Sequence, residues 1–281
     1  MVNIGYCCIN MTLAEKGITI GRGMIKRTFQ AKGIEYAGQL AEANVRDMIE
    51  IIKWNESQGI KVYRMSSDMF PWMSEYKLSD LPDYDKIANV LRGVGQIAME
   101  NGQRLTFHPG PFDVLASTTQ SVVNKCIRDL NQHGEIMDLM GLPRTPHAAI
   151  NIHVNTTQGG KEAAMQRFCD NFWLLDASVR TRLVVENDDK ESQYTVEDLY
   201  TTLNAKINIP ITFDYHHHKF CSGDLTEQEA LELAITTWPK GIVPVVHYSE
   251  SRDEKKPQAH SDYIERIPET YGNVVDIMVE A

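Results

Sequence analysis

The sequence is poor in cysteine, and its cysteines have no spacing that is typical of a metal site. Five cysteines occur among 281 residues, and none belongs to a Cys-x-x-Cys pair. An odd number without regular spacing does not build a disulfide framework. We therefore expect free thiols, as in proteins of the reducing cytosol.

Long hydrophobic runs are also missing. No stretch approaches the roughly 18 consecutive apolar residues that a membrane helix needs. The first residues show no basic segment followed by an apolar one, as a signal peptide would have. These features predict a cytoplasmic protein with no membrane partner, and the hydrophobic content of 42% is typical of a globular chain.

Positive charge is scarce. The chain has 28 lysine and arginine residues against 38 aspartate and glutamate residues, which gives a formal net charge of -10. This balance argues against nonspecific binding of a polyanion. It does not exclude a polyanion at one site, because metal ions would neutralise acidic side chains there.

Short β-branched apolar runs alternate with longer amphipathic stretches, which is the pattern of βα units. Strands are predicted at 2–8, 61–66, 104–108, 148–153, 182–186, 209–214, 243–247 and 274–279. Helices are predicted near 36–58, 83–101, 117–140, 159–178, 195–205, 226–236 and 260–266. The alternation favours a single (β/α)8 TIM barrel over residues 1–281, with a doubly wound open sheet as the alternative.

Six consecutive predicted strands end in a side chain that can bind metal. These residues are His108, His153, Glu186, Asp214, His247 and Glu280. The carboxyl ends of barrel strands meet at one mouth, so the sequence predicts a metal cluster at the C-terminal face of the strands. His217, in the run Asp214-Tyr215-His216-His217-His218, and His260 are two further candidates.

A single histidine at a strand end is more commonly structural than a metal ligand. Six in succession favour a metal site, because buried carboxylates and imidazoles are costly unless something binds them. Eight donors exceed one tetrahedral site and suit two or three ions, such as zinc or manganese. Clusters of this kind suit hydrolysis at phosphorus.

Several motifs stand in order along the chain: Gly5-Tyr6-Cys7-Cys8-Ile9-Asn10, Tyr63-Arg64-Met65-Ser66-Ser67-Asp68-Met69-Phe70-Pro71, Phe107-His108-Pro109-Gly110, Asn151-Ile152-His153, Glu186-Asn187-Asp188-Asp189, Asp214-Tyr215-His216-His217-His218, His247-Tyr248-Ser249-Glu250 and His260-Ser261-Asp262-Tyr263-Ile264. In this combination the chain resembles the UV-damage endonuclease family from end to end.

The resemblance implies a TIM barrel with up to three divalent ions, usually manganese, with zinc or iron as alternatives. By motif position the ligands would be His108, His153, Glu186, Asp214, His217, His247, His260 and Glu280. Glu186 would bridge ions, and Glu186, His217 and His260 would take part in catalysis. The implied reaction is hydrolysis of the DNA phosphodiester immediately 5′ to a cyclobutane pyrimidine dimer or 6-4 photoproduct, which leaves a 3′ hydroxyl.

The resemblance also implies DNA contacts. Tyr6 and Asn10 match positions that contact damaged bases, although Tyr6 could equally be a barrel-core aromatic. Arg64, Ser67 and Lys161 are expected to bind phosphate or to support the ligands, with an ion pair inside the barrel as the alternative for Arg64. Asn187 is expected to fix a ligand or a phosphate.

Three places depart from the family pattern, and one of them is Val245, where some members have a lysine near the metals. The family usually has a metal-binding histidine where this chain has Glu75, whose carboxylate could replace the imidazole or could be solvated and leave an ion short of a ligand. The family usually has Gln-Tyr, which wedges into the duplex, where this chain has Pro111-Phe112. Phe112 keeps a ring that can stack in the gap, whereas Pro111 lacks the amide group.

Other functions remain open on the same barrel. An apurinic-site endonuclease or a sugar isomerase would share the metal-rich strand ends, and a damaged-DNA binder could have lost cleavage. The expected partner is double-stranded DNA with a lesion. We expect a monomer without a protein partner, located in the cytoplasm or, in a prokaryote, at the nucleoid.

Overall fold

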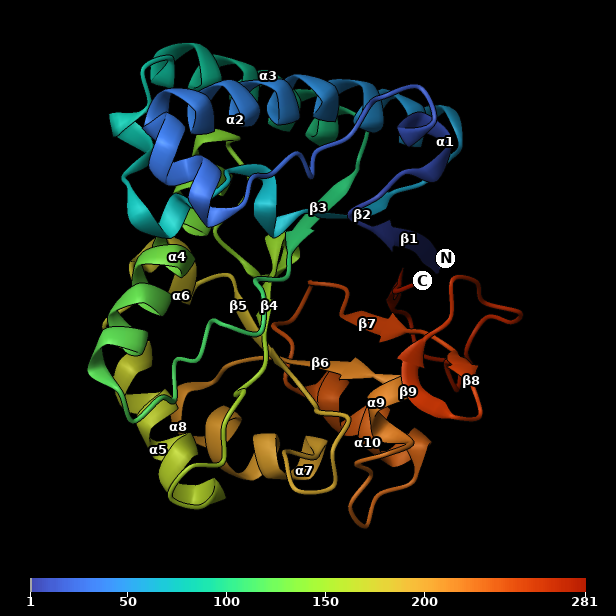
Figure 1. The fold of residues 1–281 in the computed structure, drawn as a ribbon. Coiled ribbons are helices and arrows are strands. Elements are labelled where there is room, and N and C mark those ends of the chain that lie inside the picture. Colours follow the sequence, from blue (N-terminus) through green and yellow to red (C-terminus); the bar gives the residue numbers. More distant parts are fainter. Residues whose placement is uncertain (1) are drawn as a thin grey trace.

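The computed structural model describes residues 2–281, so Met1 of the predicted 1–281 unit lies outside it. Eight parallel strands close into a barrel (Figure 1). They are β1 (Asn3–Cys7), β2 (Val62–Met65), β3 (Arg104–Phe107), β4 (Ile150–Ile152), β5 (Leu183–Glu186), β6 (Ile211–Asp214), β7 (Val245–Tyr248) and β10 (Asp276–Val279). The order around the barrel is β1-β10-β7-β6-β5-β4-β3-β2.

Helices surround most of the barrel (Figure 1). The longer ones are α2 (Lys26–Ser57), α3 (Tyr84–Glu100), α4 (Gln120–Leu139), α5 (Lys161–Phe172) and α10 (Glu227–Thr236). The shorter ones are α1 (Met11–Ala14), α6 (Ala177–Arg180), α7 (Val196–Leu199), α8 (Ala205–Ile207) and α9 (Tyr215–His218), and 3-10 turns lie at Ser67–Met69, Met73–Glu75, Leu78–Asp80 and Pro146–Ala148. Of the helices in residues 2–281, none is both long and apolar enough to cross a membrane.

Apolar side chains are buried on both faces of the strands, as expected where helices cover a parallel barrel. The larger cluster packs between strands and helices, and a smaller one contains Val62, Ala149, Val184, Val245 and Met278. Residues two apart on a strand share a face. Polar residues two positions after a member of the smaller cluster therefore point to the same face of the barrel as that member.

Gly5 shows how closely the strands approach. It pairs with Val62 of β2, and a side chain at this position would collide with the Val62 carbonyl group. Only glycine lets β1 and β2 come together here.

All eight barrel strands lie where the sequence predicts them, but the helix predicted at 260–266 is wrong. The antiparallel hairpin of β8 (Ser251–Asp253) and β9 (Lys256–His260) ends where this helix was expected to begin, and residues 261–266 form bends without a helix. The Glu250 carboxylate accepts hydrogen bonds from the backbone amides of Glu265 and Arg266, at 3.1 and 3.3 Å. These bonds hold the segment in a non-helical path over the mouth.

The other predicted helices are present, but their first and last residues differ from the predicted ones. The helix expected from residue 36 begins at Lys26, and Gly33 interrupts it with a φ of 66°. The helix expected at 159–178 is divided into α5 and α6.

Candidate metal centre

The predicted ligands meet at the mouth of the barrel. His108 and His153 follow β3 and β4, Glu186 and Asp214 end β5 and β6, His247 lies in β7, and Glu280 follows β10. Seven ligand candidates form three overlapping groups, in each of which the donor atoms lie within 4.8 Å of one another: His108, His247 and Glu280; His108, His153 and Glu186; and Glu186, Asp214 and His217.

Glu186 is the centre of the arrangement. Its carboxylate is fully buried, and Oε2 lies 3.0 Å from His247 Nδ1 and 3.2 Å from His108 Nε2. On the other side, Oε1 lies 3.3 Å from His217 Nδ1 and 3.7 Å from His153 Nε2. One carboxylate therefore reaches imidazoles from four different segments, as a bridging ligand would.

Glu280 occupies a second position beside His247. Its Oε1 lies 3.0 Å from His247 Nδ1 and pairs with the Arg64 guanidinium, and its Oε2 lies 3.7 Å from His260 Nδ1. His260 thus lies at the edge of the centre although it belongs to none of the three groups. Its side chain is 32% exposed, against 17% for His108, so it is the imidazole that faces solvent most.

The turn after β6 brings His217 into the centre. Asp214 caps α9, since its Oδ1 accepts a hydrogen bond of 2.7 Å from the His217 amide. Asn187 pairs with the Asp214 backbone, accepting from its amide at 2.8 Å and donating to its carbonyl oxygen at 3.1 Å. These bonds hold the Asp214 backbone and the first turn of α9 beside β5.

The electrostatics follow from burial and close packing. Burial opposes ionisation of Glu186, but the charges of His247 and His153 outweigh it and hold the Glu186 pKa well below its usual range. Burial likewise lowers the pKa of His247, but Glu186 and Glu280 overcome this effect and raise that pKa to about 10. At Asp214, burial dominates and raises the pKa.

The residues fit divalent metal ions. Glu186 Oε1, Asp214 Oδ2, His153 Nδ1 and His247 Nδ1 are buried and make no hydrogen bond, although several lie close to oppositely charged groups. Buried polar atoms without a hydrogen bond are costly unless a cation binds beside them. Imidazole and carboxylate donors suit manganese, zinc or iron.

Two residues that the sequence reasoning did not select support this group. Asn151 donates a hydrogen bond from its side-chain amide to Glu186 Oε2, and Asp188 Oδ1 lies 3.2 Å from His153 Nδ1. A period-2 pattern could have indicated Asn151, because it lies two residues before His153 on the same strand. A carboxylate behind a ligating histidine fixes the ring orientation.

The predicted DNA contacts divide into exposed and internal residues. Pro111 is exposed, and the Phe112 side chain is 89% exposed on the loop after β3. Tyr6 instead points toward the helices, donating to Asn55 Oδ1 at 2.8 Å and accepting from Asn10 Nδ2 at 2.7 Å. Asn10 is buried and caps α1, so the structure favours the core alternative for Tyr6 and an internal role for Asn10.

Four other predicted contacts are engaged within the protein. Asn187 is fully buried and pairs with the Asp214 backbone, which favours its ligand-fixing alternative, and Arg64 takes the ion-pair alternative through Glu280. Ser67 donates to the His108 carbonyl oxygen at 2.6 Å, and Lys161 pairs with Asp198 at 2.8 Å. Lys161 keeps about a third of its side chain exposed.

Glu75 does not join the ligand groups. Its Oε1 lies 2.8 Å from Lys125 Nζ on α4, and its side chain is 38% exposed. The structure therefore gives the solvated alternative for this residue, because its charge is compensated at the surface by a lysine.

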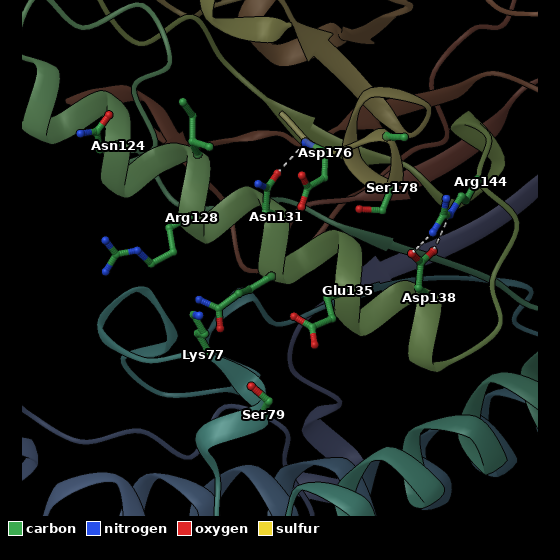
Figure 2. Close-up of a pocket in the computed structure, with 13 residues that line it drawn as sticks. Lys77, Ser79, Asn124, Arg128, Asn131, Glu135, Asp138, Arg144, Asp176 and Ser178 are labelled. Carbon is green, nitrogen blue, oxygen red and sulfur yellow. Dashed lines mark hydrogen bonds and ion pairs between the residues drawn. The ribbon is translucent and has the colours of Figure 1, made fainter. Parts of the chain in front are cut away.

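A groove of about 740 Å³ lies along α4 (Figure 2), and none of the ligand candidates lines it. Its side chains largely satisfy one another: Arg144 pairs with Asp138 at 2.6 Å, and Asn131 accepts from the Asp176 amide at 2.9 Å. It brings together no imidazole or thiol. The strand-end centre is therefore the stronger candidate for catalysis.

Comparison with known proteins identifies the family of this chain. The family model described as UV-endonuclease UvdE matches residues 2–281. A UV-damage endonuclease of Schizosaccharomyces pombe is 36% identical over 293 residues, which cover 99% of this chain and 48% of that protein. A UV DNA damage endonuclease of Bacillus mycoides is 32% identical over 250 residues, which cover 85% of this chain and 76% of that protein.

Solved structures show the same fold. The crystal structure of SacUVDE matches with a TM-score of 0.87 and 30% sequence identity, over 100% of this chain and 93% of that one. A D-psicose 3-epimerase of Clostridium cellulolyticum matches with a TM-score of 0.54 and 13% identity, over 82% of this chain and 78% of that one. The epimerase likeness concerns the fold alone.

Proposed function

Because the chain belongs to the UV-endonuclease UvdE family, we propose that it is a metal-dependent DNA repair endonuclease. It hydrolyses the phosphodiester bond immediately 5′ to a cyclobutane pyrimidine dimer or a 6-4 photoproduct and leaves a 3′ hydroxyl. The observation that carries this proposal is the set of three overlapping ligand groups, two of which share Glu186.

The three groups would hold up to three divalent ions, with manganese as the first candidate. When bound, the ions supply positive charge that activates water and stabilises both the attacking and the leaving oxygen. The ligands are His108, His153, Glu186, Asp214, His217, His247, His260 and Glu280.

Protein groups order this centre. Glu186 fixes the relative positions of four imidazoles, and Arg64 holds Glu280 by an ion pair inside the barrel. Catalysis is assigned to Glu186, His217 and His260. His260 is the most exposed of the three, so it is the group placed to meet the substrate and to protonate the leaving 3′ oxygen.

Lesion recognition depends on unstacking. Photolesions stack poorly, so a lesion-containing duplex opens at a lower energetic cost than an intact one. The exposed ring of Phe112 would stack in the gap that results, and Pro111 would hold its loop. The substrate is double-stranded DNA, and the protein acts as a cytoplasmic or nucleoid-associated monomer.

A nicking assay with added manganese tests the proposal. One duplex carries a single thymine dimer, a second carries an abasic site, and a third is intact. A cut directly 5′ to the dimer is expected, and the Glu186→Gln variant should not cut.

Other results would redirect the assignment. Cutting of the abasic duplex alone would mean an apurinic-site endonuclease. Tight binding of the dimer duplex without cutting, by metal-loaded protein, would mean a damaged-DNA binder. Neither binding nor cutting would favour a sugar isomerase, which is checked with ketose substrates.

A further inference from the structure

Large apolar side chains are exposed on only part of the barrel mouth. They include Ile9 and Met11 after β1, Phe112 after β3, and Tyr263 in the turn after β9, with exposed fractions of 62%, 68%, 89% and 72%. Ile25 and Ile267 are exposed farther along the connections after β1 and β9. Within residues 2–281, the loops that follow β2, β4, β5 and β6 expose no large hydrophobic side chain. The exposed apolar residues at the rim of the mouth therefore belong to the connections that follow β1, β3 and β7.

Phe112 and Tyr263 belong to opposite sides of that rim. β3 and β7 are separated by half of the closed strand order, so their ends face each other across the mouth. The two sides meet at the centre, where the rings of His108 and His247 are 5.9 Å apart. Phe112 follows His108 by four residues, and Tyr263 follows His260 by three.

The turn that carries Tyr263 is held in place. Ser261 donates its amide to the Glu250 carbonyl oxygen at 2.8 Å, and the Tyr263 amide donates to Ser261 Oγ at 3.3 Å. The Glu250 carboxylate holds the next residues through their backbone amides. An aromatic ring presented to solvent on an anchored backbone loses little conformational entropy when a partner stacks on it.

We propose that Tyr263 is a second base-stacking residue for the bound DNA, on the opposite side of the metal centre from Phe112. The inference rests on the proposed function and adds a substrate contact to it. Tyr263 stacks on an unstacked base on the β7 side, while Ile9 and Met11 line the rim between the two aromatic residues.

Nucleic acid fits this surface better than a protein partner does. The exposed apolar residues come from separate connections around the candidate hydrolytic centre, and an exposed aromatic ring can stack on any unstacked base. The adjacent hairpin also exposes Arg252, Lys255 and Lys256, beside Asp253 and Glu254, and its cationic side chains would contact phosphates. Arg252 Nε donates to the His260 carbonyl oxygen at 3.0 Å, so the hairpin is joined to the residue that borders the centre.

The test compares Tyr263→Ala and Tyr263→Phe with the wild type, all loaded with manganese. The readouts are affinity for a thymine-dimer duplex by fluorescence anisotropy, with a non-hydrolysable scissile linkage, and metal content by mass spectrometry. Tyr263→Ala should weaken affinity by ~5- to 150-fold, the equivalent of losing one stacked base. Tyr263→Phe should bind like the wild type, and metal content should be equal in all three proteins.

Tyr200→Ala is the matched control, because Tyr200 is an exposed tyrosine on the outer helices and should not affect binding. Wild-type affinity in Tyr263→Ala overturns the inference, and so does loss of metal, since the residue would then act through His260. If the wild type binds the duplex but never cuts it, the proposed function fails while the stacking comparison still decides the role of Tyr263. No binding by the wild type overturns both.

Discussion

Glu186 Oε2 lies 3.0 Å from His247 Nδ1, and both side chains are buried. The two residues come from β5 and β7, which are not neighbours in the barrel, since β6 lies between them. Their side chains meet at the mouth of the barrel, across the end of β6. The charge of Glu186 therefore organises side chains that no single strand could bring together.

Glu186→Gln should remove the charge at this contact while preserving the shape of the side chain. Metal affinity should fall by more than the ~10- to 100-fold that loss of an outer partner of a ligand costs, and nicking of the dimer duplex should be abolished. Metal titration and the nicking assay measure the two effects. Substantial cleavage by this variant would contradict the assigned centre.

Asp188→Asn should loosen His153 without removing a ligand, because Asp188 Oδ1 lies 3.2 Å from His153 Nδ1. Metal affinity should fall by roughly 10- to 100-fold, while excess metal should restore cleavage. The adjacent Asp189→Asn is the control, since only its backbone carbonyl oxygen is used, by Gln258. Equal metal affinity in both variants would remove the positioning role from Asp188.

Phe112→Ala should reduce discrimination between damaged and intact duplexes. Loss of one stacking contact corresponds to ~5- to 150-fold in affinity for the dimer duplex. Because the side chain is 89% exposed, neither the free energy of unfolding nor the metal content should change. Competition binding with both duplexes gives the selectivity, and a loss of metal would show that the wedge role is wrong.

Arg104→Met should destabilise the barrel without changing the chemistry. Arg104 pairs with Asp276 at 3.0 Å and donates to the carbonyl oxygens of Pro146, His147 and Val243, all away from the mouth. Breaking a buried pair leaves an unpaired charge and costs roughly 3–5 kcal/mol. Urea denaturation measures the loss, with the activity per folded molecule expected to remain that of the wild type.

A surface pair provides the control for this variant. Arg46 pairs with Glu42 at 2.6 Å on α2, and the Arg46 side chain is 51% exposed. Arg46→Ala should cost no more than about 1 kcal/mol. Similar losses in the two variants would mean that burial does not set the strength of the Arg104 contact.

Stability should also depend on pH through Asp113. Burial, and then the charge of Asp129, raises the pKa of Asp113 to about 9, whereas an unfolded aspartate titrates near roughly 3.9. The folded chain therefore keeps a proton that the unfolded chain releases, and the free energy of unfolding falls as pH rises between these two values.

Asp113→Asn cannot titrate, so it should lose less stability than the wild type when the pH is raised from about 6 to about 9. Urea denaturation at both pH values gives the comparison, with Asp224→Asn at an exposed position as the control. Identical losses in Asp113→Asn and the wild type would contradict the protonated state of Asp113.

The strands and most of the clustered candidate ligands were predictable because their signals are local. An apolar run that ends in His, Asp or Glu can be recognised without knowing its neighbours, and parallel strands bring such ends to one mouth. The error at 260–266 shows the limit of local signals. There the Glu250 carboxylate, ten residues or more away from the segment, holds the backbone in a turn.

The sequence by itself therefore determined the barrel, the donor types and the place where the donors meet, since strand periodicity and side-chain chemistry are properties of short segments. Only the tertiary structure decided which partner each polar side chain binds. Arg64 pairs with Glu280, Glu75 pairs with Lys125, and Asn187 is buried against Asp214. These pairings join residues far apart in the chain, so they depend on side-chain direction and distance after the barrel has closed.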